Sequence, residues 1–288
     1  MSSEDRLQTI EKYIINMPSL PTTVSKVLEI CNNPNTSPAD LNHVISLDPV
    51  LVGRVLKLIN SAYYALGQQV TSLVRAIIML GINTVKNLAL STAVLGNFSA
   101  KNQYQAINME GFWRHSLCVG VAAKMIAKKR NVDSKQWEEY FTAGLLHDIG
   151  KIPINAVFPQ EYVVAISISD RERIPLFLAE DKALEINHCL SGEKIVKAWK
   201  LEGAVGDTIQ HHHAYIDYDG PHKDVLYSVV AANWFANIME IGFSGERYIE
   251  KIPQQLWEYL NIDKYLFDGI EESVVQEIEK AKVFLKIN

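Results

Sequence analysis

Apolar residues recur every three or four positions along most of this chain, the spacing expected for one face of an α-helix. In the first hundred residues this spacing predicts short helices, two of which begin at a Ser or Asp cap followed by proline. The predicted segments are Leu7–Ile15, Val24–Cys31, a helix opened by Ser37-Pro38, a helix opened by Asp48-Pro49, Leu73–Leu80 before Gly81, and Val85–Leu90 after Asn83. Strand-like alternation is nearly absent, so we expect an all-α fold.

The helical pattern continues in the second half of the chain. The predicted helices there are Trp113–Ile126, Trp137–Leu146 after a cap at Asp133 or Ser134, Lys182–Trp199, and Leu226–Ile238. The β-branched run Val163–Ser169 has no evident partner strand, and we assign it to helix or irregular structure. The polar stretch Asn102–Asn108 is the best candidate for a seam. We therefore expect an N-terminal helical lobe over residues 1–105 packed against a second helical lobe over residues 106–288.

Composition narrows the class of protein. The 288 residues are 48% apolar and 21% charged, and 28 Lys and Arg against 33 Asp and Glu give a net charge of −5. This mildly acidic chain attracts phosphate backbones weakly, which argues against bulk nucleic acid as a partner. The longest uncharged window, Val225–Met239, is shorter than the roughly 18 to 20 apolar residues of a membrane span. With three cysteines, no CxxC pair and no secretory signal, we expect a cytoplasmic protein without a membrane partner.

The segment Gly144–Lys151, GLLHDIGK, places polar side chains inside an apolar stretch. The preceding helix should bring His147 and Asp148 to its C-terminal end near the core, where Gly150 lets the chain turn. Burying a charged pair there is costly unless both side chains coordinate a cation, and imidazole and carboxylate are common ligands of zinc, iron and manganese. The alternative interpretation is a hydrogen-bonded His-Asp pair at a helix end.

Further histidines in the same half favour the metal interpretation. These are His115, on an otherwise apolar helix, His188, and the run His211–His213. By itself His115 is more often a core residue bonded to a carbonyl, and the run would fit a solvated turn. Successive helical residues diverge, but two adjacent histidines can converge at a helix end. The full candidate ligand set is His115, His147, Asp148, His188, His212 and His213, enough for one metal ion or for two bridged by Asp148.

The spacing of His115 and His147-Asp148 resembles the HD superfamily of helical metal-dependent phosphohydrolases. Other motifs are similar to the HDOD family, the HD-related output domains of bacterial signalling proteins. They are Met17–Pro21 (MPSLP), Leu47–Pro49 (LDP), Leu58–Ala62 (LINSA), Val70–Leu73 (VTSL), Ala76-Ile77, Leu80-Gly81 and Phe112–Ser116 (FWRHS). The resemblance runs from about residue 15 to about residue 240 and implies two helical lobes, the second similar to an HD domain. It also implies a regulatory or scaffolding role, with signalling partners binding the N-terminal lobe.

The HDIGK run of residues 147–151 is also similar to the cyclic-dinucleotide phosphodiesterase branch called HD-GYP, whose further histidines His188, His212 and His213 would match. The chain departs from that branch at Ala214, in place of glutamate, and lacks the GYP motif. Asn233 stands where HD enzymes place a ligating aspartate, and would be a weak ligand at best. These departures argue against cyclic-di-GMP hydrolysis.

Two functions from different classes follow. We favour a regulatory HDOD module that keeps a metal-binding HD pocket holding iron, manganese or zinc. The alternative is a metal-dependent phosphohydrolase acting on a phosphodiester or nucleotide. In that case Asp148 would hold the metal that activates water, Lys151 would offset charge on the phosphoryl oxygens, and Arg114 could hold a second phosphate.

Overall fold

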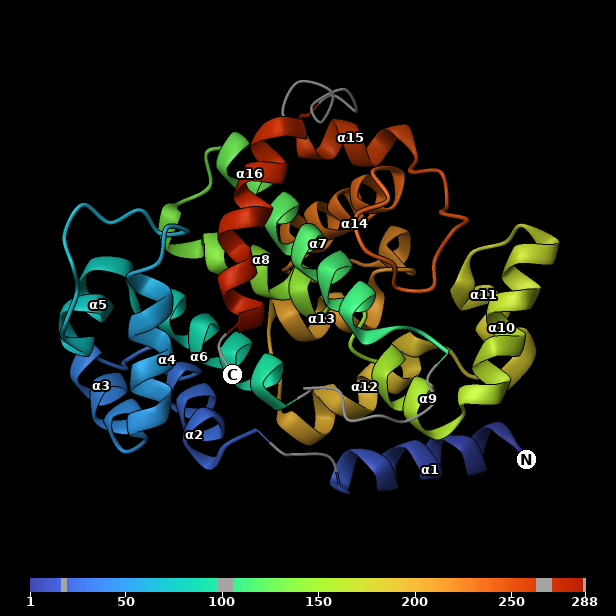
Figure 1. The fold of residues 1–288 in the computed structure, drawn as a ribbon, viewed down its shortest axis with the longest axis horizontal. Coiled ribbons are helices and arrows are strands. Elements are labelled where there is room, and N and C mark those ends of the chain that lie inside the picture. The colour runs from blue at the N-terminus through green and yellow to red at the C-terminus, as the bar shows by residue number, and fades with distance from the viewer. Residues whose placement is uncertain (17–19, 98–105, 263–270, 287–288) are drawn as a thin grey trace.

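The structure is a computed structural model that describes residues 1–16, 20–97, 106–262 and 271–286. Every regular element within these ranges is a helix, which confirms the all-α prediction (Figure 1). The α-helices are α1 Ser3–Asn16, α2 Thr22–Cys31, α3 Pro38–Ser46, α4 Pro49–Ile59, α5 Leu73–Leu80, α6 Ile82–Asn97, α7 Met109–Lys129, α8 Trp137–Leu146, α9 Lys151–Val157, α10 Pro159–Glu172, α11 Leu176–Leu184, α12 His188–Trp199, α13 Ala204–His211, α14 Lys223–Ile238, α15 Gln254–Leu260 and α16 Glu271–Ala281. Short 3-10 turns lie at Ser134–Gln136 (η1), Tyr215–Asp217 (η2) and Lys282–Lys286 (η4).

Side-chain caps start several of the N-terminal helices where the sequence predicts them. The Ser37 hydroxyl accepts a hydrogen bond from the Asp40 backbone N–H, and the Asp40 carboxylate accepts one from the Ser37 N–H at 2.9 Å. The Asp48 carboxylate likewise accepts from the Leu51 N–H at 3.0 Å. Gly81 ends α5 with a φ of 89°, a backbone conformation that side chains with a Cβ avoid. Part of the predicted MPSLP stop, residues 17–19, lies outside the described residues.

The single helix predicted over Lys182–Trp199 is wrong. Helix α11 ends at Leu184, Glu185 takes a left-handed φ of 55°, and α12 begins at His188. Asn187 caps α12, because its side-chain oxygen accepts from the backbone N–H groups of the first turn. The apolar spacing runs through this break and hides it. The ambiguous run Val163–Ser169 lies within α10.

Helix α7 is the centre of the second lobe and packs against α8, α14 and α16. Its crossing with α8 is close because two glycines meet there: a Cβ on Gly144 would lie 2.8 Å from the Cα of Gly120. The close crossing brings the end of α8 alongside the buried His115 of α7, whose ring centroid lies 5.9 Å from that of His147.

The two halves of the chain share buried contacts. Helix α6 packs against α8, with the hydroxyls of Ser91 and Thr142 3.2 Å apart. Helix α1 lies along α9 and α12, outside the first-lobe helices α2 to α6 (Figure 1). Residues 98–105, which include most of the predicted seam Asn102–Asn108, lie outside the described residues, so the division at residue 105 stays a prediction.

Within the described part of the chain, no single helix has both the length and the hydropathy of a bilayer crossing. One bent pair, Leu73–Leu80 with Ile82–Leu95, passes that test of length and composition with its two helices 118° apart.

Candidate metal centre

His147 and Asp148 follow the last turn of α8 and are each 1% exposed. The chain passes from α8 into α9 through Gly150, whose φ of −64° is ordinary right-handed helix. The turn therefore does not require a glycine, contrary to our expectation. A Cβ there would lie 1.9 Å from the His188 carbonyl oxygen and 2.6 Å from the Gly192 nitrogen. Gly150 is needed because α12 packs directly on this turn and brings His188 to Asp148.

Three imidazoles converge on the Asp148 carboxylate. The Nε2 atoms of His188 and His212 lie 3.3 Å and 3.6 Å from its Oδ1, and His147 Nε2 lies 3.4 Å from its Oδ2. The Nε2 atoms of His188 and His212 are 3.2 Å apart. These residues come from the α8 end, the first turn of α12 and the α13 end, so the cluster forms only when the three helices pack together.

The opposite nitrogen of each ring is already engaged. His147 Nδ1 donates to the Gly144 carbonyl at 2.8 Å, and His212 Nδ1 donates to the Thr208 carbonyl at 3.0 Å. His188 Nδ1 donates to the buried Glu180 carboxylate at 2.6 Å. Because these oxygens can only accept, each Nδ1 carries a proton, and each ring in its neutral form directs an Nε2 lone pair at the carboxylate.

Such a convergence of lone pairs is unfavourable unless a positive charge lies among them. His147 Nε2 and Asp148 Oδ1 are buried without a hydrogen-bond partner in the described structure. With metal–ligand bonds of about 2.0 to 2.2 Å, neighbouring ligand atoms lie about 3 to 3.5 Å apart, close to the separations found here. These residues therefore fit a divalent metal ion.

The electrostatics of the cluster agree with this fit. Burial lowers the pKa of His147 to about 3 and that of His115 to about 4, so both rings are neutral at pH 7. Burial also disfavours a charged His212, but the Cys189 thiol and Asp148 outweigh it and raise its pKa to about 10. The pocket thus favours one positive charge, which a proton on His212 or a metal ion can supply.

Two further candidates, His115 and the weak ligand Asn233, are satisfied by hydrogen bonds. His115 Nε2 donates to the Asn233 amide oxygen at 3.0 Å, and Asn237 donates to the same oxygen at 2.9 Å. A ring that donates from Nε2 has no lone pair there for a metal. His115 still lies with His147 and Asp148 in a group close enough to share an ion.

Three predicted residues lie apart from this convergence or are already paired. The His213 ring stacks on Phe177 with centroids 4.1 Å apart. His213 belongs to neither of the two groups close enough to share an ion, which are His115 with His147 and Asp148, and His188 with Cys189 and His212. Lys151 is 2% exposed, and its Nζ donates to Asp148 Oδ2 at 2.8 Å and to Ser244 at 3.3 Å. Arg114 is exposed and lines a different pocket, beside α16.

Sequence reasoning missed two neighbours of the cluster. Glu180, fully buried on α11, accepts from both the backbone N–H and the ring of His188, at 2.8 Å and 2.6 Å. Cys189 places its sulfur 3.9 Å from His212 Nδ1. The only local signal for Glu180 was an acid on the apolar face of a helix.

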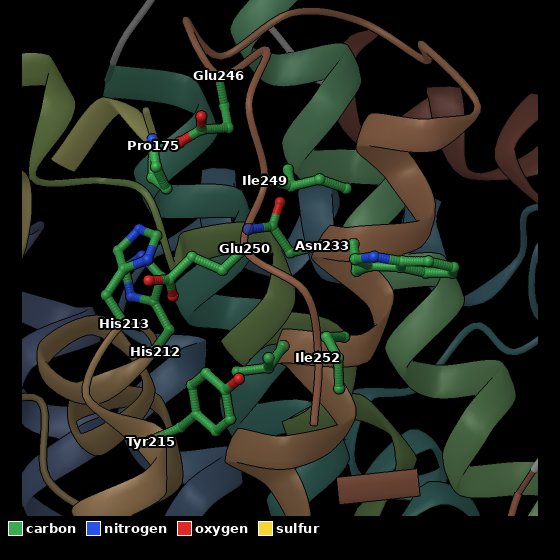
Figure 2. Close-up of a pocket in the computed structure, with 11 residues that line it drawn as sticks. Pro175, His212, His213, Tyr215, Asn233, Glu246, Ile249, Glu250 and Ile252 are labelled. Carbon is green, nitrogen blue, oxygen red and sulfur yellow. The ribbon is translucent and has the colours of Figure 1, made fainter. Parts of the chain in front are cut away.

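A pocket opens beside the cluster (Figure 2). Its lining includes His212 of the cluster and Asn233, the hydrogen-bond partner of His115. The remaining lining residues come from the segments around α11, α13 and α14 and from the loop before α15: Pro175, His213, Tyr215, Val230, Trp234, Glu246, Ile249, Glu250 and Ile252. A small ligand bound there would be next to the metal ligands.

Known proteins share this fold. The crystal structure of an HDOD domain protein of unknown function from Geobacter sulfurreducens matches with a TM-score of 0.76 and 24% identity, over 98% of this chain and 99% of its own. A candidate phosphohydrolase from Shewanella amazonensis SB2B matches with a TM-score of 0.68 and 22% identity, over 96% of this chain and 98% of its own. At these identities the likeness shows the fold alone.

Among curated proteins, an uncharacterized protein of Treponema pallidum (strain Nichols) is 24% identical over 256 residues. That match takes in 88% of this chain, which spans about half (48%) of the length of the Treponema protein. The HDOD domain family description matches residues 17–215, well over half of the sequence. The chain therefore belongs to the HDOD family.

Proposed function

We propose that this chain is a bacterial signalling module of the HDOD family that holds one divalent metal ion in its second lobe. The observation that carries the proposal is the convergence of three imidazole Nε2 atoms on the Asp148 carboxylate, with each Nδ1 bonded to a protein acceptor. Iron, manganese and zinc all accept this mixture of imidazole and carboxylate ligands.

His147, Asp148, His188 and His212 would hold the ion. When bound, the metal supplies positive charge to the buried carboxylate and polarises what binds beside it. The His115 and Asn233 side chains bond to each other, which favours one ion over two.

The placement of the cationic side chains favours regulation over turnover. Lys151 is buried and held by Asp148 and Ser244, and Arg114 lies at another pocket. Neither is placed to meet a phosphoryl group above the cluster. We propose instead that the occupied centre stiffens the packing of α8, α12 and α13, and that a cytoplasmic signalling partner binds the N-terminal lobe, which packs on α8 through α6.

Phosphohydrolase activity is the second candidate. The pocket that reaches His212 and Asn233 favours it, because a ligand there would be adjacent to the metal. Asn233→Asp would add a carboxylate beside His115. If this candidate is correct, the change should raise the metal content toward two ions per chain and increase hydrolysis.

The test is metal analysis of the purified protein, together with hydrolysis of an aryl phosphodiester and a cyclic-dinucleotide panel. We expect about one metal ion per chain, lost in His147→Ala and Asp148→Asn and kept in His43→Ala, which alters an exposed histidine of the first lobe. Turnover should not depend on the metal. Metal-dependent turnover abolished by either centre variant would establish the second candidate, and wild-type protein that binds no metal would contradict both.

A further inference from the structure

The pocket beside the metal centre has an unusual charge for a site next to a phosphohydrolase-like cluster. None of the described residues that line it is lysine or arginine, whereas two are glutamates, Glu246 and Glu250. The buried Lys151 nearby already donates to Asp148 and Ser244. Sites that recognise phosphate normally present arginine, lysine or a free helix N-terminus. This lining presents acids instead.

The charges of the pocket and the adjacent cluster also sum to an excess of negative charge. Four carboxyl groups, those of Asp148, Glu180, Glu246 and Glu250, stand against Lys151 and, in the metal-free protein, a protonated His212. A divalent metal ion that replaces the His212 proton would leave at most one excess negative charge. The loaded site would still hold no positive excess for a phosphate dianion, and it would retain attraction for a cation.

The remaining walls suit an apolar body with a polar head. Ile249 and Ile252 approach from the loop before α15, and Tyr215 forms the opposite wall (Figure 2). Tyr215 is 4% exposed, and none of the described residues hydrogen-bonds to its hydroxyl. In the close-up the Glu250 side chain points toward the rings of His212 and His213. A carboxylate and an unpaired hydroxyl are thus available to accept from one bound donor.

We propose that this pocket binds a small organic cation, an ammonium group on an apolar body, with Glu250 as its counter-ion and Tyr215 and Ile249 as its walls. This deepens the proposed function, since it names the ligand class of the same regulatory site. The ammonium group donates to the Glu250 carboxylate, as donor-only groups prefer charged acceptors. Phosphate esters of the same body are disfavoured, because their charge has the sign of the lining.

Three probes with one apolar body separate these possibilities: benzylamine, benzyl alcohol and benzyl phosphate. Their dissociation constants are measured by calorimetry on the full chain, both metal-free and metal-loaded. We expect benzylamine to bind about tenfold more tightly than benzyl alcohol, and benzyl phosphate no more tightly than the alcohol. Glu250→Gln should bring benzylamine to within about threefold of the alcohol. Glu258→Gln, an exposed acid on α15, should leave the preference intact.

Ile249→Ser should weaken benzylamine and benzyl alcohol alike, which distinguishes the wall from the counter-ion. The proposal is overturned if benzyl phosphate binds most tightly, if the probes bind equally, or if none binds. Measuring the metal content of each sample distinguishes failure of the pocket assignment from failure of the proposed metal binding. Amine preference in protein that takes up no metal would leave the pocket assignment standing while removing the metal centre.

Discussion

At the scale of single side chains, Glu180 supports the proposed metal ligands without being one of them. Its carboxylate accepts from His188 Nδ1 and so directs His188 Nε2 at Asp148. Tyr162 donates to the other Glu180 oxygen at 2.7 Å, which fixes the carboxylate from behind. Such outer partners set both the tautomer and the basicity of a metal-binding imidazole.

Glu180→Gln should weaken metal binding about 10- to 100-fold, because an amide can replace the acceptor but not its charge. The measurement is competition for metal with a chromophoric chelator. Glu185→Gln changes an exposed acid at the end of the same helix and should leave the affinity within about twofold. Equal affinities for all three proteins would exclude a positioning role for Glu180.

The sequence indicates the ligands of the centre better than it indicates their supports. His147 and Asp148 are marked by their apolar surroundings, and His188 by lying in the same half as the other candidate histidines. His213 follows His212 directly, but a turn of about 100° per residue sends its ring to Phe177 instead. Glu180 is marked only as an acid on the apolar face of a helix, and its partner His188 lies across a helix break that the apolar pattern hides.

At the level of helices, the junction of α8, α9 and α12 controls the geometry of the centre. Gly150→Ala should destabilise the fold by about 3 kcal/mol, because the new Cβ would overlap the His188 carbonyl. The free energy of unfolding in urea provides the measurement. Gly53→Ala, on α4 with open space around it, should instead stabilise by about 0.5 to 1 kcal/mol. A tolerated Gly150→Ala would contradict the tight contact between α9 and α12.

The loop that follows α14 is tied to α11 through Glu246, whose carboxylate accepts from the Leu176 N–H at 3.0 and 3.1 Å. Burial raises the pKa of Glu246 to about 7, although Lys151 opposes the shift. Because the folded pKa exceeds the unfolded one, ionisation of Glu246 destabilises the folded state. The contribution to the free energy of unfolding therefore falls as pH rises from about 4.5 to about 7, by up to about 3 kcal/mol.

Glu246→Gln cannot ionise and should lack this component of the pH dependence. Melting temperatures of both metal-free proteins between pH 5 and pH 8 check the prediction: the variant should gain stability over the wild type as pH rises. Parallel profiles would show that Glu246 does not titrate in this range.

Helix starts were predictable where a side chain makes the cap, as at Ser37 and Asp48, because the signal is local. The break at Glu185, where the backbone turns left-handed, was not, because Ala183, Leu184 and Ile186 continue the apolar pattern through it. The requirement for glycine at position 150 was also not predictable, because it comes from the contact with α12, which begins almost forty residues later in the chain.

On the scale of the whole molecule, the C-terminal segment joins the two halves. The Phe284 ring lies 5.3 Å from that of Tyr63 in the first half and 4.7 Å from that of Phe141 in the second. Helix α1 makes a further connection, since Glu11 pairs with Lys194 of α12 at 2.6 Å. The sequence predicts that the lobes pack together, but apolar spacing alone could not show which distant helices meet.

Phe284→Ala should lower the free energy of unfolding by about 3 kcal/mol, because it removes a 1%-exposed ring from three-way packing. Val275→Ala, on the exposed side of α16, should change it by no more than about 0.5 kcal/mol. Urea titration of both variants gives the comparison. A loss at position 284 as small as that at 275 would mean that the C-terminal segment does not contribute to the core.

The most direct test of the metal centre is anomalous X-ray diffraction from crystals grown with manganese or zinc. We predict one strong peak among the Nε2 atoms of His147, His188 and His212 and the Asp148 carboxylate, about 2.0 to 2.2 Å from each ligand atom. A peak elsewhere, or ordered side chains without any peak between them, would contradict the account.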